Sequence, residues 1–203
     1  MPHHRVDAGQ LRASEAYRLL ISALIPRPIA WIGSRSADGI DNLAPFSYFM
    51  GVGSAPPSLA VSVARLAGGG LKDTARNILQ TGVFTVSIPT VGQAAQVAGS
   101  AAAVGPELSE FALVGLRPRD GAQVAAPFPE EAAFAMECRL MHALDLGSTH
   151  LIVGEVLAFH LSDRLDPAAL DPRALDPLAR LGGADYAGLG PTFTVPTPRV
   201  LGG

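Results

Sequence analysis

The sequence contains one cysteine and one lysine, and only 16% of its 203 residues are charged. A single cysteine, Cys138, cannot form an intrachain disulfide or a metal-thiolate cluster, so we expect a reducing, cytoplasmic location. The formal net charge is −3 and the basic residues form no run, which argues against binding of nucleic acid. Every other residue of the Lys and Arg class is arginine, which draws attention to Lys72.

Several familiar sequence signals are also missing. The N-terminus lacks the apolar run of a signal peptide, and the apolar segments are interrupted before they could span a bilayer, so a soluble protein is expected. Neither a GxSxG motif nor a P-loop occurs, because GGGLKDT lacks the Walker spacing. His142, His150 and His160 have no partner at metal-ligand spacing, so no metal site is expected.

Apolar side chains make up 48% of the chain, which is enough for one sizeable core and too little for two ordinary domains. We expect a single domain over 1–203, with roughly the first 12 and the last 10 residues peripheral. Strand patterns recur at short intervals, helices are few and no βαβ alternation occurs. This organisation predicts a mainly β protein, an antiparallel barrel with short helical insertions.

Turn and cap signals divide the chain. Ser14 can cap a first helix, which Pro26 ends. Asp38-Gly39 predicts a hairpin between 29–34 and 40–46. A second helix is expected over 74–81, with Asp73 or Thr74 as its cap and Gly82 at its end. The other expected elements are strands over 58–63, 84–88, 134–140 and 151–161, with a bend at Gly154, and a short helix over 107–111.

The segment Lys72-Asp73-Thr74 directly precedes or opens the second helix. Unpaired backbone N–H groups and the helix macrodipole favour an anion at such a terminus, and an ammonium and a hydroxyl beside them would complete a phosphate site. The plainer alternative is that Asp73 or Thr74 only caps the helix while Lys72 is a solvated surface charge. The segment alone leaves both interpretations open.

The segment NLAPFS (42–47) is also open to two interpretations. Asn42 and Ser47 offer polar side chains, Pro45 interrupts the strand ladder and Phe46 offers an apolar surface, which suits the polar edge of a heteroaromatic ring. An ordinary edge strand leading to a turn would look the same. Arg27, held between two prolines, could pair with a phosphate or simply with a carboxylate.

Taken in order, these segments resemble the flavin reductase-like family of FMN-binding split-barrel proteins, which includes flavoredoxins. The resemblance covers about Tyr17 to Tyr186 and implies a six-stranded Greek-key barrel that dimerises and binds FMN at the subunit interface. It is carried by PRPIAWIGS (26–34), NLAPFSYF (42–49), PP (56–57), KDTARN (72–77), EF and GL (110–116), EC (137–138), HLIVGEV (150–156) and RLGGADY (180–186).

The resemblance also implies a site. Contacts to the FMN phosphate and ribityl chain are expected from Arg27, Ser34, Lys72, Asp73, Thr74 and Asn77. The isoalloxazine ring is expected against Asn42, Ala44, Pro45, Phe46 and Ser47. His150, as a catalytic candidate, and the segment with Arg180, Gly182 and Tyr186 are expected near the flavin, the latter from the partner subunit. The chain departs from the family at Met50, where many members have Asn, and in the glycine run 68–70.

The expected function is therefore an FMN-dependent oxidoreductase in which NAD(P)H reduces the flavin and the electrons pass to an unidentified acceptor. A second hypothesis is a flavin-binding electron-transfer protein of the flavoredoxin kind that does not turn over NAD(P)H. A third is a barrel reshaped for haem or an F420-like deazaflavin. The intact KDTARN and NLAPFS segments favour the flavin hypotheses over the third.

Overall fold

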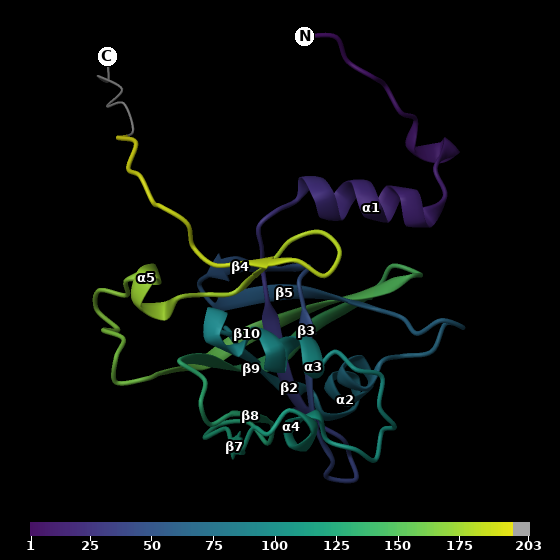
Figure 1. Ribbon diagram of the computed structural model, residues 1–203. Coiled ribbons are helices and arrows are strands. Elements are labelled where there is room, and N and C mark those ends of the chain that lie inside the picture. Colours follow the sequence, from purple (N-terminus) through teal and green to yellow (C-terminus); the bar gives the residue numbers. More distant parts are fainter. Residues whose placement is uncertain (197–203) are drawn as a thin grey trace.

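In the computed structural model, residues 1–196 are described, and they fold around one antiparallel sheet (Figure 1). The sheet has seven strands in the order β3-β2-β6-β9-β10-β5-β4. The expected mainly β, antiparallel barrel is thus confirmed, with one strand more than six. The strands are β2 (Ala30–Arg35), β3 (Asp41–Phe46), β4 (Phe49–Ser54), β5 (Pro57–Ala64), β6 (Val83–Ser87), β9 (Phe134–Asp145) and β10 (Thr149–Leu161).

Short elements surround this sheet. Two small sheets are formed by β1 (Arg27–Pro28) with β11 (Ala179–Arg180) and β12 (Tyr186–Ala187), and by β7 (Pro118–Asp120) with β8 (Pro127–Pro129). The α-helices are α1 (Ala13–Ala23), α2 (Asp73–Thr81), α3 (Ala94–Gly99), α4 (Glu110–Leu113) and α5 (Pro172–Leu175). Two 3-10 turns, η1 (Ala8–Gln10) and η2 (Val91–Gln93), complete the described elements.

The connection between β3 and β4 forces the sheet to curl. These strands lie at opposite edges of the sheet, yet only Ser47 and Tyr48 join them. Six strand spacings would separate the edges of a flat sheet by about 29 Å, whereas the step from Phe46 to Phe49 spans at most about 11 Å. The sheet therefore closes on itself, and because β3 and β4 are not paired with each other, the barrel is split at this point.

Two apolar clusters follow from strand alternation. Ile32 on β2 joins the barrel interior, where Phe84 and Ile152 are fully buried, and α2 closes the interior with Ile78. Trp31, the neighbour of Ile32, points to the opposite face. There it packs in a second cluster with Leu43, Val97, Phe111 and Leu178, under α3 and α4.

Most expected elements are present. The hairpin turn holds Gly39 at φ 85°, and Gly82 ends α2 in the left-handed conformation with φ 74°. Gly154 is a point of close approach as expected, since a Cβ there would lie 2.6 Å from the ring of Phe84. The pairing of β10 with β9 shifts register between Val153 and Gly154, which is the expected bend.

Three expectations about helix ends were wrong. Helix α1 begins at Ala13, so Ser14 lies inside it, and Arg12 takes the cap position with its backbone N–H bonded to Glu15. Lys72, instead of Asp73 or Thr74, occupies the cap position of α2. The expected helix over 107–111 is the shorter α4, which starts at Glu110. At α2 the side chains of Asp73 and Thr74 are bonded elsewhere, to Arg76 and Asn42, which competes with capping.

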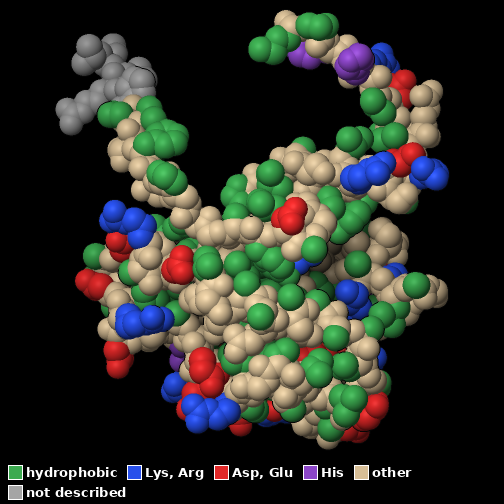
Figure 2. Space-filling model, in the orientation of Figure 1, with side chains coloured by type: hydrophobic (Ala, Val, Ile, Leu, Met, Phe, Trp, Pro, Cys, Tyr) green, Lys and Arg blue, Asp and Glu red, His purple; other side chains and the backbone are tan. Residues whose placement is uncertain are grey.

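Helix α1 stands apart from the core. Figure 2 shows the N-terminal segment projecting from the body, and no residue of α1 is buried. Its apolar face holds Tyr17, Leu20, Ile21 and Leu24, and of these Leu20 and Leu24 are 50% and 56% exposed. The apolar face thus lacks a full partner among residues 1–196 of this chain. The last seven residues of the C-terminus that was expected to be peripheral lie outside the described residues.

Gly33 is required where β8 crosses β2. A Cβ at this position would lie 1.8 Å from the carbonyl oxygen of Pro127 and 2.6 Å from Oγ1 of Thr85. We expect Gly33→Ala to lower the free energy of unfolding by about 3 kcal/mol through overpacking. Urea unfolding would measure this. Gly51→Ala is the matched control, because nothing lies within 4 Å of a Cβ on that strand glycine, and equal losses in the two variants would contradict the prediction.

Candidate functional site

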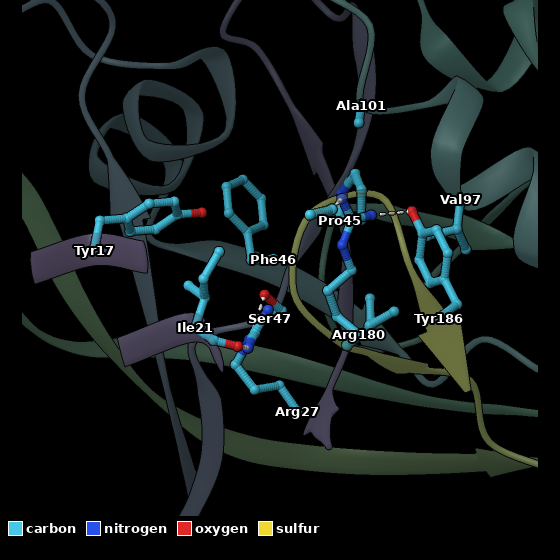
Figure 3. A pocket seen from close by; sticks show the side chains of 12 residues that line it. Tyr17, Ile21, Arg27, Pro45, Phe46, Ser47, Val97, Ala101, Arg180 and Tyr186 are labelled. Atoms are coloured by element: carbon cyan, nitrogen blue, oxygen red, sulfur yellow. Dashed lines mark hydrogen bonds between the residues drawn. The ribbon is translucent and has the colours of Figure 1, made fainter. Parts of the chain in front are cut away.

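Two cavities adjoin at the split in the barrel, with volumes of about 200 Å³ and about 330 Å³. Both are lined by Pro45, Phe46 and Ala101, so they form one groove divided by the end of β3. The first is further lined by Tyr17, Ile21, Arg27, Ile29, Ser47, Val97, Arg180, Gly183 and Tyr186 (Figure 3). The second is further lined by Asn42, Ala44, Leu66, Lys72, Asp73, Thr74, Arg76, Ser100, Ala102, Ala103, Val104, Pro106 and Glu110.

The N-terminus of α2 opens into the second cavity. No side chain of the described residues caps this terminus, so its first backbone N–H groups keep their attraction for an anion. Lys72 is exposed, and its Nζ lies 5.7 Å from the centre of the Phe46 ring. Asp73 forms an ion pair with Arg76, which neutralises the one carboxylate of the first turn. The ammonium, the helix end and the wall formed by Phe46 thus belong to a single cavity.

A buried polar network supports the floor of this cavity. Oδ1 of Asn42 accepts hydrogen bonds from Thr74 Oγ1 at 2.8 Å and from Ser34 Oγ at 3.2 Å. Nδ2 of Asn42 donates to both carboxylate oxygens of Glu110, at 3.0 and 2.9 Å. The hydroxyl of Thr74 has only one proton and gives it to Asn42. A contact from Thr74 to an anion therefore comes from its backbone N–H.

Ser34 and Asn77 lie beneath this floor and line neither cavity. Both are buried, and Nδ2 of Asn77 donates to Ser34 Oγ at 3.2 Å. Oδ1 of Asn77 is buried without a hydrogen-bond partner among the described residues. Among the residues expected at the phosphate, the structure thus brings Lys72, Asp73 and Thr74 together at the cavity and sets Ser34 and Asn77 one layer below.

Arg27 holds two segments together at the first cavity, away from Lys72. Its Nη1 donates to the carbonyl oxygens of Ile21 and Leu24, at 2.7 and 3.0 Å, which are at the end of α1. Its Nη2 donates to the carbonyl oxygen of Leu181 at 2.7 Å, and its Nε donates to Ser47 Oγ at 3.2 Å. Within the described residues, the partners of Arg27 are thus three backbone carbonyls and one hydroxyl, and none of them is a carboxylate.

The hairpin of β11 and β12 forms the far wall of the first cavity. The guanidinium carbon of Arg180 lies 4.4 Å from the centre of the Tyr186 ring, and Arg180 also donates to the Tyr186 hydroxyl. Nη2 of Arg180 donates to the carbonyl oxygen of Gly183 at 2.6 Å. Gly182 faces the end of α1, since a Cβ there would lie 3.8 Å from Ser22 Oγ. In Figure 3, Tyr17 and Ile21 stand on one side of Phe46, and Arg180 and Tyr186 on the other.

Small side chains line the opposite wall of the groove. Nε1 of the buried Trp31 donates to Ser100 Oγ at 2.9 Å, and Ser100 Oγ donates to the carbonyl oxygen of Val97 at 3.1 Å. This fixes the start of the segment Ala101–Val104, which lines the second cavity. Alanine side chains leave room for a flat ring to lie close to the backbone.

Three further positions singled out in the sequence also lie outside both cavities. His150 is buried between β5 and β9, its Nε2 is 3.5 Å from Nη2 of Arg65, and its Nδ1 has no hydrogen-bond partner among residues 1–196. Met50 is 61% exposed on the edge strand β4. The glycine run 68–70 is held by Arg65, whose Nη1 donates to the carbonyl oxygen of Gly69 at 2.8 Å.

Sequence reasoning missed Glu110 as a site residue. Its carboxylate lines the second cavity, is 5% exposed and accepts the backbone N–H of Leu43 at 2.9 Å. Burial raises the pKa of Glu110 above its ordinary value, and the hydrogen bonds from Leu43 and Asn42 only partly oppose this shift. In the sequence, the signal for Glu110 was its position as a single acidic residue directly before Phe111, which belongs to the second apolar cluster.

The family model described as "Flavin reductase like domain" matches residues 22–179. The chain belongs to the flavin reductase-like family. The family relatives include the uncharacterized protein YwrF of Bacillus subtilis, which is 37% identical over 201 residues, covering 95% of this chain and 98% of YwrF. The expected family is thus confirmed.

Two solved structures of the family are close in fold. Nitrilotriacetate monooxygenase component B from Bacillus cereus has a TM-score of 0.91 and 33% identity, covering 96% of this chain and 100% of that one. The 2-nitrobenzoate 2-nitroreductase NbaA of Pseudomonas fluorescens has a TM-score of 0.86 and 26% identity, covering 98% and 99%. Membership of this family supports a flavin-related redox function and a flavin cofactor.

Two further observations concern residues 1–196 as a whole. No group of three or more His, Cys, Asp or Glu side chains in this part of the chain could hold a metal ion. None of the helices described is long and apolar enough to cross a membrane.

A second buried carboxylate, Glu137, lies outside the groove. It accepts hydrogen bonds from the backbone N–H groups of Ala122, Gln123 and Val124, at 2.8, 2.6 and 2.9 Å, and lies 2.6 Å from Nε2 of His160. Burial alone would raise the pKa of Glu137, but these hydrogen bonds together outweigh it and leave the pKa below the ordinary value.

The sign of this shift predicts a pH dependence of stability. Because the folded pKa of Glu137 lies below its ordinary value of 4.5, the ionised carboxylate stabilises the fold above that pH. The contribution is lost as the pH falls through the folded pKa. In urea unfolding at stepped pH from about 5 to about 3, we expect the wild type to lose stability more steeply than Glu137→Gln. The exposed Glu107→Gln should keep the wild-type slope, and parallel curves for Glu137→Gln and the wild type would contradict the prediction.

Proposed function

We propose that this protein is an FMN-binding oxidoreductase that uses NAD(P)H to reduce the flavin and passes the electrons to an acceptor. The observation that carries the proposal is the continuity of the groove. An anion-binding helix end with Lys72 opens into the same cavity as the flat wall formed by Ala44, Pro45 and Phe46. A phosphate joined to a flat heteroaromatic ring is the ligand that such a groove fits.

The donor set of the groove fits FMN. The second cavity combines Lys72 with uncapped helix N–H groups, which suits the phosphate. Strand β3 is an edge strand, so alternate backbone groups face away from β2, and Leu43 uses its outward N–H for Glu110. Pro45 shares this side and has no N–H, so a ring can cover it without burying a donor that lacks a partner.

The residues of the chain would bind and orient the cofactor. When bound, FMN supplies the reversible redox chemistry, and the protein supplies position and electrostatics. The side-chain oxygen of Asn42 accepts hydrogen bonds from Thr74 and Ser34, and its amino group donates to Glu110. The role of Asn42 is therefore to hold β3 against α2. The segment Ala101–Val104 would cover the ring and exclude water from it.

A second candidate function is electron transfer by a bound flavin without turnover of NAD(P)H. One observation favours it: the first cavity, which lies next to the proposed ring position, has a volume of about 200 Å³. This is below the roughly 300 to 1,000 Å³ of pockets for drug-sized ligands, and a nicotinamide dinucleotide would extend far outside it. The two similar structures, a monooxygenase component and a nitroreductase, are redox proteins by name, which agrees with either candidate.

The proposed assembly is a homodimer. The apolar side chains of α1, among them Tyr17 at 57% and Leu24 at 56% exposure, lie beside the first cavity. Met50 and Val52 on the edge strand β4 are 61% and 53% exposed. Apolar surface of this extent marks an interaction site. A second copy would cover it and could bring His150 to the groove as the catalytic candidate.

The phosphate anchor can be tested with two flavins. We expect Lys72→Ala to weaken FMN binding by about tenfold, the effect of losing one charge-assisted hydrogen bond. Binding of riboflavin, which lacks the phosphate, should not change. Fluorescence titration of FMN and riboflavin into the wild type and the variant measures both. Equal affinities of the two proteins for FMN would sink the proposed anchor.

The reaction itself can be tested by anaerobic addition of NADH or NADPH to the FMN-loaded protein. The oxidoreductase proposal expects bleaching of the flavin absorbance by at least one of the two within the time of a turnover assay. A spectrum that stays oxidised with both nucleotides, but bleaches with dithionite, would select the electron-transfer candidate instead.

A further inference from the structure

The first cavity carries positive charge that no carboxylate among residues 1–196 neutralises by an ion pair. Arg27 and Arg180 both line it, and its lining contains no Asp or Glu. Neither arginine forms an ion pair with a carboxylate in the described part of the chain. Most other arginines of the chain are paired in this way, for example Arg35 with Asp41 and Arg139 with Glu155. Two guanidinium groups that line one cavity without a counter-charge in its lining favour an anion there.

The two arginines differ in what they can still donate. A guanidinium has five N–H donors. Arg27 uses four of them, for Ile21, Leu24, Leu181 and Ser47. Arg180 uses two, for the Tyr186 hydroxyl and the Gly183 carbonyl, which leaves three. Arg27 thus contributes charge and holds the walls in place, whereas Arg180 is the group that can contact a ligand.

The rest of the lining is apolar or aromatic. Ile21, Ile29 and Val97 contribute aliphatic surface, and Tyr17, Phe46 and Tyr186 contribute rings (Figure 3). A bare inorganic anion would leave this surface without contacts. A volume of about 200 Å³ admits one ring with a short substituent and no dinucleotide.

We infer that the first cavity is a subsite for a small aromatic carboxylate, whose carboxylate binds Arg180 and whose ring lies among Tyr17, Phe46 and Tyr186. The inference rests on the proposed function in one respect, because the flavin places this ligand next to a redox group across Phe46 and Pro45. Binding of the anion itself depends only on residues of this chain. Contacts with Tyr186, which also lines the cavity, hold the guanidinium of Arg180 in position.

Calorimetric titration of benzoate tests the inference, with the neutral benzamide as the matched ligand. The protein is titrated with and without bound FMN. We expect benzoate to bind both forms and benzamide to bind at least about tenfold more weakly, since it lacks the charge. Equal affinity for the two ligands would overturn the inference, and so would loss of benzoate binding when FMN is present, because the cavity would then belong to the flavin.

Variants separate the contact from the fold. Arg180→Gln should weaken benzoate binding by about tenfold or more, and Arg180→Lys should recover part of it. Arg117→Gln, at an arginine that pairs with Glu130 away from the groove, should bind as the wild type does. Thermal melting shows whether each variant is folded. A folded Arg180→Gln with wild-type affinity for benzoate would overturn the inference.

The same titrations keep the two proposals apart. Binding of benzoate with no binding of FMN would remove the proposed function and leave the anion subsite. Binding of FMN with no binding of benzoate to either form would remove the subsite and leave the proposed function.

Discussion

The two-residue connection between β3 and β4 is the constraint on which the rest of the structure depends. It joins the opposite edges of a seven-stranded sheet, so the sheet must curl until those edges meet. The end of β3 lies at the seam left between them. Pro45, Phe46 and Ser47 occupy this seam, and both cavities are built on them. Topology thus determines where the site lies before any functional side chain is considered.

Two polar clusters then set the shape of the groove. Asn42 and Glu110 join β3 to α4 and to the first turn of α2 through buried hydrogen bonds. Arg27 joins the end of α1 to the hairpin of β11 and β12. Each cluster includes groups far apart in the sequence, such as Arg27 with Leu181 and Asn42 with Glu110, and loss of one member would leave buried polar atoms without partners. Their contribution is to hold the walls at a fixed distance, which is what rigid ligand recognition needs.

The sequence predicted elements where a local signal was strong. Asp38-Gly39 fixed the first hairpin and Gly82 the end of α2, because both positions need left-handed backbone. Strand β4 was not expected, since its residues alternate with glycines and its apolar side chains face outward. The expected cap of α2 was wrong because the Thr74 hydroxyl donates to Asn42, 32 residues away, and the side chain is not used by its own helix.

The prediction of the site was limited in the same way, because local signals could be read from the sequence and contacts between distant segments could not. Residue types allowed the cavity end with Lys72 and Thr74 to be found, because a helix N-terminus is a local feature. They could not separate polar residues that face a ligand from those that support them. Ser34 and Asn77 have the right chemistry for a phosphate, yet the fold places them under the floor of the groove. Glu110 was overlooked for the complementary reason, since its partners Asn42 and Leu43 lie more than 60 residues away.

The hydrogen bond between Trp31 and Ser100 has a spectroscopic consequence. Trp31 is the single tryptophan of the chain and is fully buried, so the intrinsic fluorescence of the protein comes from one indole in a defined environment. Its N–H is bonded to the residue that begins the alanine wall of the groove. A change in that wall should therefore change the fluorescence emission of Trp31, so the site can be followed without an added label.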